Sequence, residues 1–141
     1  MRAKEYLSRA YYLDKDIDSR QRELDLMRKN LTSVKTTQMQ QDIVQSSNSH
    51  HYDERYSKLI ELDEDITKKI DELVQFKTKI TKEIDRVTDK LNMIILRERY
   101  INMLEWHEIA NLLDQSERHV TRLHGYALED FEKANKNLFM S

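Results

Sequence analysis

Apolar residues recur along the first part of the chain at alternating spacings of three and four. This heptad pattern predicts a long helix that packs against a second helix along one seam. Arg20 is the polar fault in the pattern. The two rows of the seam are Ala3, Ala10, Ile17, Leu24 and Leu31, and Tyr6, Leu13, Arg20, Met27 and Val34.

The pattern fades in a polar stretch, about residues 36–53, that is rich in Gln, Ser, Thr and Asn. We expect this stretch to be a loop. A second heptad pattern follows, with the rows Leu59, Ile66, Leu73, Ile80 and Val87, and Leu62, Lys69, Phe76 and Glu83. Two helices of matched length with one connection most simply fold back on each other. Residues 1–87 are therefore predicted to form a long antiparallel coiled-coil hairpin.

Two polar residues, Lys69 and Glu83, stand inside the second seam. Ile70 and Ile84 follow them directly and can take over their packing. Together with Val74, these isoleucines also make the apolar stripe wider than a contact between two helices needs. The extra width indicates a further partner surface, either for another copy of the chain or for the C-terminal domain. We expect the chain to form a homo-oligomer.

Residues 88–141 are predicted to form a small domain of three helices. Either Thr88 or Asp89 suits the N-cap of its first helix. Two short helices are expected next, at about 106–113 and 117–135. The final residues, "NKNLFMS", are expected to be a fraying tail. The fold class predicted for the whole chain is all-α.

The break between the two short helices fits a helix-turn-helix. Ala110 is small, as the crossing point of two helices requires, and Asp114 tolerates the left-handed backbone conformation of such a turn. Ser116 is a good N-cap for the second helix. The apolar residues that would hold the two helices together are Ile109, Leu113, Val120 and Leu123. The agreement of spacing, turn residue and cap favours this motif.

The outward side of the second helix carries the predicted contacts to double-stranded DNA. Arg can bind a guanine edge or a phosphate, and Ser and Thr suit phosphates or a thymine methyl group. A glycine there allows close approach of a DNA backbone, or close packing against the preceding helix. His124 is expected at the flank of the helix, and Trp106 and Tyr100 in the core. The predicted DNA-binding residues are Ser116, Glu117, Arg118, His119, Thr121, Arg122 and Gly125.

Composition supports the all-α prediction and restricts the function. The 141 residues include no Pro and one Gly, although turns between strands usually need both. Residues 88–141 carry 7 basic and 9 acidic residues, within a chain of net charge −2. This balance argues against strong, charge-driven DNA binding by a single copy. It favours a rival function, an interaction protein that binds RNA polymerase or another regulator through its hairpin.

Other function classes lack their motifs. "HEIAN" begins like a zinc-protease helix, but Asn111 replaces the second His. No Gly-rich phosphate loop is present, and the absence of Cys excludes disulfides and thiolate sites. We therefore expect no enzyme activity, no metal and no cofactor. No apolar run approaches the roughly 18–20 residues of a membrane span, and the N-terminus lacks a secretory signal pattern. We expect a cytoplasmic protein without a membrane partner.

The C-terminal part resembles the fourth conserved region of bacterial sigma factors. The matching residues are Leu96-Arg97, residues 107–110 ("HEIA") and Ala127-Leu128. Sigma recognition helices usually begin with a Thr-Arg-Glu-Arg-like run, whereas residues 116–119 here are "SERH". The cap and one basic position therefore match, but the base preferences of sigma factors are not carried over.

Nearly the whole chain is also similar to the ArpU/RinA-like late-gene regulators of phages and prophages of Gram-positive bacteria. The stretches that carry this likeness are "MRAKEYLSRAYYLD" at the start and "RYINMLEWHEIANLL" with "RHVTRLHGYAL" near the end. The resemblance implies a transcription regulator that binds phage promoter DNA in a bacterial host cell. It also implies RNA polymerase as a candidate partner.

Overall fold

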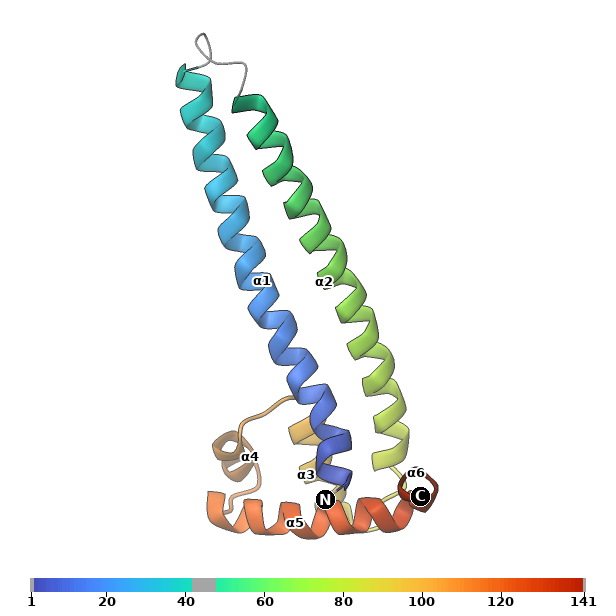
Figure 1. The fold of residues 1–141 in the computed structure, drawn as a ribbon. Helices are drawn as coiled ribbons and strands as arrows, with labels where there is room; N and C mark the ends of the chain where they lie inside the picture. Colours follow the sequence, from blue (N-terminus) through green and yellow to red (C-terminus); the bar gives the residue numbers. More distant parts are fainter. Residues whose placement is uncertain (1, 42–47, 141) are drawn as a thin grey trace. The chain divides into compact units, whose positions relative to one another are not determined.

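The computed structural model describes residues 2–41 and 48–140, and only the backbone in 32–41 and 48–53. Every regular element in these ranges is a helix (Figure 1), which confirms the all-α fold class. The helices are α1 (Arg2–Gln41), α2 (Asn48–Ile84), α3 (Lys90–Tyr100), α4 (Trp106–Leu112), α5 (Glu117–Ala134) and α6 (Lys136–Phe139). Contacts divide the chain into two compact units, residues 14–72 and the remainder. We call them the hairpin unit and the α5 unit.

The two long helices extend into the predicted loop. α1 continues to Gln41 and α2 begins at Asn48, so much of the stretch predicted as a loop, residues 36–53, is helical. Residues 42–47 of that stretch lie outside the described residues. The loop prediction was too long because Gln, Ser and Thr cost a helix only a few tenths of a kcal/mol each relative to Ala. No Pro or Gly interrupts them.

The hairpin unit consists of antiparallel segments of α1 and α2. The Lys69 ammonium lies 3.7 Å from the Asp16 carboxylate. One turn further along α1, Arg20 Nη1 lies 2.8 Å from Asp65 Oδ2. As the residue number rises in α1 it falls in α2, which confirms the predicted hairpin. The seam residues Ile17, Leu24 and Ile66 are buried between the two segments. The side chain of Val34, at the end of the predicted seam, lies outside the described residues.

The polar residues predicted as faults in the seam are accommodated by charge pairing. Arg20 binds Asp16 and Asp65 on the two helices. Lys69 remains in the seam with a side chain only 25% exposed, because its ammonium reaches Asp16 and its aliphatic stem can pack. The prediction that Ile70 takes over this position was therefore wrong, since Ile70 is 42% exposed.

In the α5 unit, α3 and α4 both pack against α5 (Figure 1). The first turns of α1 and the last turns of α2 belong to the same unit. The Tyr6 ring lies 5.5 Å from the Phe76 ring, and its hydroxyl donates a 2.6 Å hydrogen bond to Glu83. Ile84 is fully buried, as predicted. This compact unit therefore extends beyond residues 88–141, the range expected from the sequence.

The C-terminal residues are not a fraying tail. α6 follows α5 directly, and the Phe139 ring lies 5.9 Å from the rings of both Tyr6 and Phe131. Asn135, between the two helices, is fully buried. Its amide donates to the Glu83 carbonyl at the end of α2 and to the Phe131 carbonyl. The prediction failed because two of these partners, Tyr6 and Glu83, lie far away in the sequence and leave no local pattern.

Candidate nucleic-acid interface

α4 is the first helix of the predicted motif, and its ends and its buried face are as expected. The Glu105 backbone N–H donates a 2.9 Å hydrogen bond to Glu108 Oε1, which fixes the first turn. Ile109 and Ala110 are buried against Val120 of α5. The small Ala110 side chain therefore stands in the contact between the two helices. This contact orients α5 relative to α4.

The turn between α4 and α5 has the predicted geometry. Asp114 adopts the left-handed conformation, with φ of 55°. The Gln115 backbone N–H donates a 3.0 Å hydrogen bond to the Ala110 carbonyl, which closes the end of α4. Ser116 then caps α5, because its hydroxyl oxygen accepts a 3.1 Å hydrogen bond from the His119 backbone N–H. The helix-turn-helix predicted from the sequence is therefore present in the backbone.

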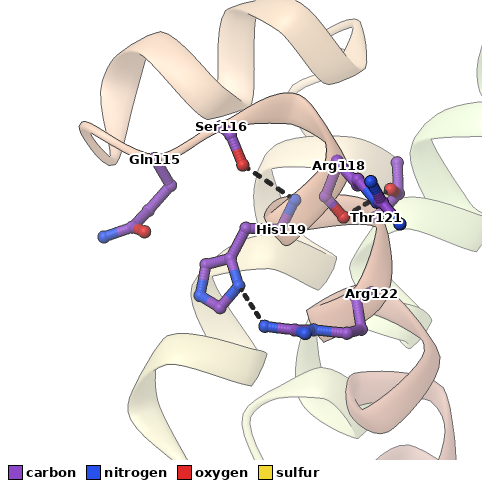
Figure 2. A pocket seen from close by; sticks show the side chains of 6 residues that line it. All are labelled: Gln115, Ser116, Arg118, His119, Thr121 and Arg122. Atoms are coloured by element: carbon purple, nitrogen blue, oxygen red, sulfur yellow. Dashed lines mark hydrogen bonds between the residues drawn. The ribbon is translucent and has the colours of Figure 1, made fainter.

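All seven predicted contact residues lie on α5 or at its N-cap. Five of them are exposed, while His119 and Gly125 are half-buried. Figure 2 shows the N-terminal part of this face, an open depression beside the turn. Its lining residues are Gln115, Ser116, Arg118, His119, Thr121 and Arg122.

Two residues of the depression hold each other in place. Arg122 Nη2 lies 2.7 Å from His119 Nδ1, one turn earlier on α5 (Figure 2). A guanidinium can only donate, so Nδ1 of His119 must be the acceptor. In this contact the N–H of the His119 ring is on Nε2. This contact limits the positions that the guanidinium of Arg122 can take above the helix.

The remaining polar side chains differ in what they can offer a ligand. The Thr121 hydroxyl lies 2.9 Å from the Arg118 carbonyl and donates to its own helix, so toward a ligand it can only accept. The Ser116 oxygen accepts from the helix, which leaves its hydroxyl hydrogen able to donate to a phosphate. Glu117 in the first turn of α5 suits the positive end of the helix dipole. Its carboxylate also repels phosphate.

Two residues of this face were missed by the sequence analysis. Gln115 lines the depression at the end of the turn. Tyr126 is 55% exposed, and it follows Arg118 and Arg122 at successive spacings of four. Residues at this spacing share one side of a helix. The same spacing rule, applied to the whole of α5, could have found Tyr126.

His124 is a core residue, and the prediction that it lies at the flank of the helix was wrong. It is 6% exposed, and its ring lies 4.6 Å from the ring of Trp106. Its Nε2 lies 2.7 Å from the hydroxyl of Tyr100, which is also buried, and the two groups share a hydrogen bond. Burial, with smaller contributions from the charges of Lys4 and Arg99, lowers the pKa of His124 to about 4. The neutral imidazole thus ties α5 to α3 and α4.

Gly125 has no packing role in the structure. A Cβ atom built on it would meet no atom within 4 Å. Of the two roles considered for this glycine, close packing against the preceding helix is therefore wrong. The space beside Gly125 remains open to a ligand.

The described parts of the chain contain no group of three His, Asp or Glu side chains that could hold a metal ion. None of the helices that the structure describes combines the length and the apolar character of a membrane span.

The chain belongs to the protein family of unknown function DUF1492, whose model matches residues 30–132. The matched range contains the second half of the hairpin, both helices of the helix-turn-helix and all seven predicted contact residues. No curated protein and no solved structure matches the chain.

Proposed function

We propose that this protein is a transcription regulator of the phage type that binds double-stranded promoter DNA through α5. The observation that carries the proposal is the α4–α5 turn, with Asp114 in the left-handed conformation and Ser116 as the cap of α5. Arg118 and Arg122 follow on the exposed side of that helix. The second helix of such a motif enters the major groove, and its N-terminal residues meet base edges.

Each residue of the face has a role in this proposal. Arg122, positioned by His119, binds a base edge, and guanine is the preferred partner of arginine. Arg118 binds a base or a phosphate. The hydroxyl of Ser116 and the N-terminus of α5 meet a phosphate, as helix N-termini favour anions. Gly125 leaves room for the DNA backbone.

The other basic residues near α5 give this assignment further support. Arg97 Nη1 lies 3.1 Å from the Asp85 carboxylate. The Arg99 guanidinium lies over the ring of Trp106, 4.5 Å from its centroid. Both arginines are therefore engaged within the protein. Arg118 and Arg122 are exposed in the first turns of α5, whereas the exposed Lys133 lies in its last turn, away from the α4–α5 turn.

The charge balance of residues 88–141, with 7 basic and 9 acidic residues, requires help from additional copies. A homo-oligomer would add the phosphate contacts of several α5 helices. The resemblance to ArpU/RinA-like regulators supports promoter DNA as the ligand and the cytoplasm of a bacterial host as the location. The proposal involves no catalytic step and no cofactor.

The test is DNA binding by the double variant R118A/R122A. DNA sites are first selected from a random pool by the parent chain, and affinity is then measured at two salt concentrations. Loss of a base contact costs about 1–3 kcal/mol and relaxes the preference at that base, whereas loss of a phosphate contact reduces the salt slope by about one. For each arginine removed, we expect the double variant to show either the loss of affinity and base preference or the smaller salt slope.

The matched control is K82A/K90A, which removes two exposed positive charges outside α4 and α5. It should bind the selected DNA nearly as the parent does. Circular dichroism would verify that both variants remain helical. Equal affinity of R118A/R122A and the parent at the same salt would show that α5 does not bind the DNA.

A second candidate function is protein binding without DNA, through the hairpin. The acidic excess of residues 88–141 favours it. RNA polymerase or another regulator would then be the partner. If the parent chain selects no DNA at low salt but binds purified RNA polymerase, this second function replaces the first.

A further inference from the structure

α2 carries a second apolar row besides its seam with α1. The large apolar side chains that are exposed on this helix are Tyr56, Ile60, Ile70 and Val74, with exposed fractions of 49%, 42%, 42% and 56%. Three of them belong to the hairpin unit, and Val74 follows Ile70 by one turn of the same helix. At 100° per residue all four fall on one side of α2, which we call the outer row.

The outer row is separate from the face that packs against α1. Ile66 and Leu73, in the seam, are buried. The outer row lies roughly a quarter to a third of a turn further around the helix. Asp63 and Thr67 fill the two positions between Ile60 and Ile70, so the row 56, 60, 63, 67, 70, 74 has alternating steps of four and three. That is the repeat of a coiled-coil contact.

The order of residues in the outer row is symmetric on reversal. Two apolar residues stand at each end and two polar residues stand in the middle. We propose that a second copy of this chain packs on the outer row with its α2 antiparallel. Ile60 then faces Ile70 of the second copy, Tyr56 faces its Val74, and Asp63 faces its Thr67.

Other arrangements of two copies fit less well. A parallel pair would place the two Asp63 carboxylates against each other, and like charges in a contact are unfavourable. In the antiparallel pair each Asp63 faces the uncharged Thr67, whose hydroxyl donates a 3.0 Å hydrogen bond to the Asp63 carbonyl of its own helix, so no like charges meet. Arg28, with a nitrogen 3.6 Å from Asp63, partly balances the carboxylate. An antiparallel pair shifted by one heptad would oppose Ile60 to Asp63 and lose the match of apolar residues.

The reversal symmetry also favours a second copy over a different protein. A two-fold contact uses the same surface on both partners, so residue i meets j and j meets i. A contact with a different protein needs no such symmetry. The outer row would be the contact surface of the oligomer in the proposed function, with the two α2 helices antiparallel. The test of this contact uses no DNA, so either proposal can fail without the other.

The chain contains no Cys, which makes a cysteine test of direction straightforward. The variants I60C and I70C are produced with different tags, alone and together in one cell, and treated with a short thiol-reactive cross-linker. We expect covalent dimers from the co-expressed pair and few from either variant alone. Cross-linking of I60C to itself would indicate a parallel pair and overturn the proposal.

A second measurement tests the surface itself. Light scattering should find a dimer or larger even-numbered assembly for the parent, and I70E should shift it to smaller species. The matched control is L26E, which places the same charge at an exposed leucine of α1 in the same unit. L26E should remain assembled, and circular dichroism should show both variants to be helical. A monomeric parent, or equal assembly of I70E and L26E, would contradict the proposal.

Discussion

The α5 unit and the hairpin unit contain similar kinds of residues but use them differently. In the α5 unit, apolar side chains such as Ile95, Leu96 and Phe131 are fully buried. In the hairpin unit, Ile17, Leu24 and Ile66 form a thin buried seam, and charge pairs extend along it. Two helices alone can bury only one side of each other. The α5 unit therefore has a core of its own, whereas the hairpin unit has one buried seam and keeps apolar side chains such as Ile60 and Ile70 exposed.

Buried polar groups show the same difference. In the α5 unit, Glu83, Asn92, His124 and Asn135 are buried. Each has a hydrogen-bond partner, and within the described residues no buried side-chain N or O atom lacks one. In the hairpin unit, Arg20, the polar residue of the α1 seam, remains partly exposed beside its carboxylates. Loss of a buried partner is costly, whereas exposed ion pairs contribute little. Substitutions in the α5 unit should therefore have the larger effects.

The largest effect is expected for Phe131→Ala. Phe131 is fully buried and contacts the rings of Tyr6 and Phe139, so the truncation leaves a cavity in the core. The free energy of unfolding should fall by about 3–5 kcal/mol. Trp106 is the only Trp in the chain and lies in the same unit, so its fluorescence in a urea titration reports the loss.

The comparison substitution in the hairpin unit is Leu26→Ala. Leu26 is 61% exposed, so its removal should change the free energy of unfolding by no more than about 0.5 kcal/mol. If Phe131→Ala proved equally mild, the α5 unit would not have the core described above.

A smaller effect is expected when pH is lowered. The pKa of His124 lies at about 4 in the folded protein, below its ordinary value of 6.5. Unfolding therefore takes up a proton at pH values between these two, and stability is lost as pH falls from about 6.5 toward 4. Between pH 7 and pH 5 the loss should be about 2 kcal/mol. Urea titrations at the two pH values measure it.

Two variants isolate the contribution of His124. His124→Gln cannot titrate, and its amide can still form a hydrogen bond with Tyr100, so most of the loss between pH 7 and pH 5 should disappear. His107 is exposed on α4, and His107→Gln should leave the loss unchanged. If the stability of His124→Gln depended on pH as that of the parent does, protonation of His124 would not be the cause of the loss.

The sequence predicted the helix-turn-helix because all of its signals are local. Ala110, Asp114 and Ser116 have roles set by their nearest neighbours along the chain, and the structure confirms all three. The ends of the two short helices were close for the same reason. The candidate contacts follow from the cap position and from helical spacing along α5, and their binding of DNA stays a prediction.

The sequence could not predict which polar side chains are buried. In the sequence, His124 resembles any polar residue on a helix, because its hydrogen-bond partner Tyr100 lies 24 residues earlier. Asn135 holds the carbonyl of Glu83, 52 residues away. Such pairs leave no periodic signal. The sequence also shows where the apolar seam fades. A helix does not end at such a point unless a helix-breaking residue follows, so the predicted loop was too long.

A smaller effect than those of Phe131→Ala and of pH, and one that separates stability from function, is expected for Gly125→Ala. Gly in a helix interior costs about 0.5–1 kcal/mol relative to Ala, and a Cβ here meets no atom within 4 Å. The free protein should therefore become more stable by about that amount in a urea titration. If α5 enters a groove, the added methyl group should at the same time weaken binding to the selected DNA.

Substitutions of Arg118 and Arg122 should weaken DNA binding without changing the free energy of unfolding, because both side chains are exposed. Tyr126→Ala, at the neighbouring position, is the control for Gly125→Ala. It removes side-chain volume near the same place, whereas Gly125→Ala adds a methyl group. A gain in stability with unchanged DNA affinity would show that Gly125 lies outside the contact. The glycine at this position would then have no structural explanation, because a Cβ there meets no atom within 4 Å.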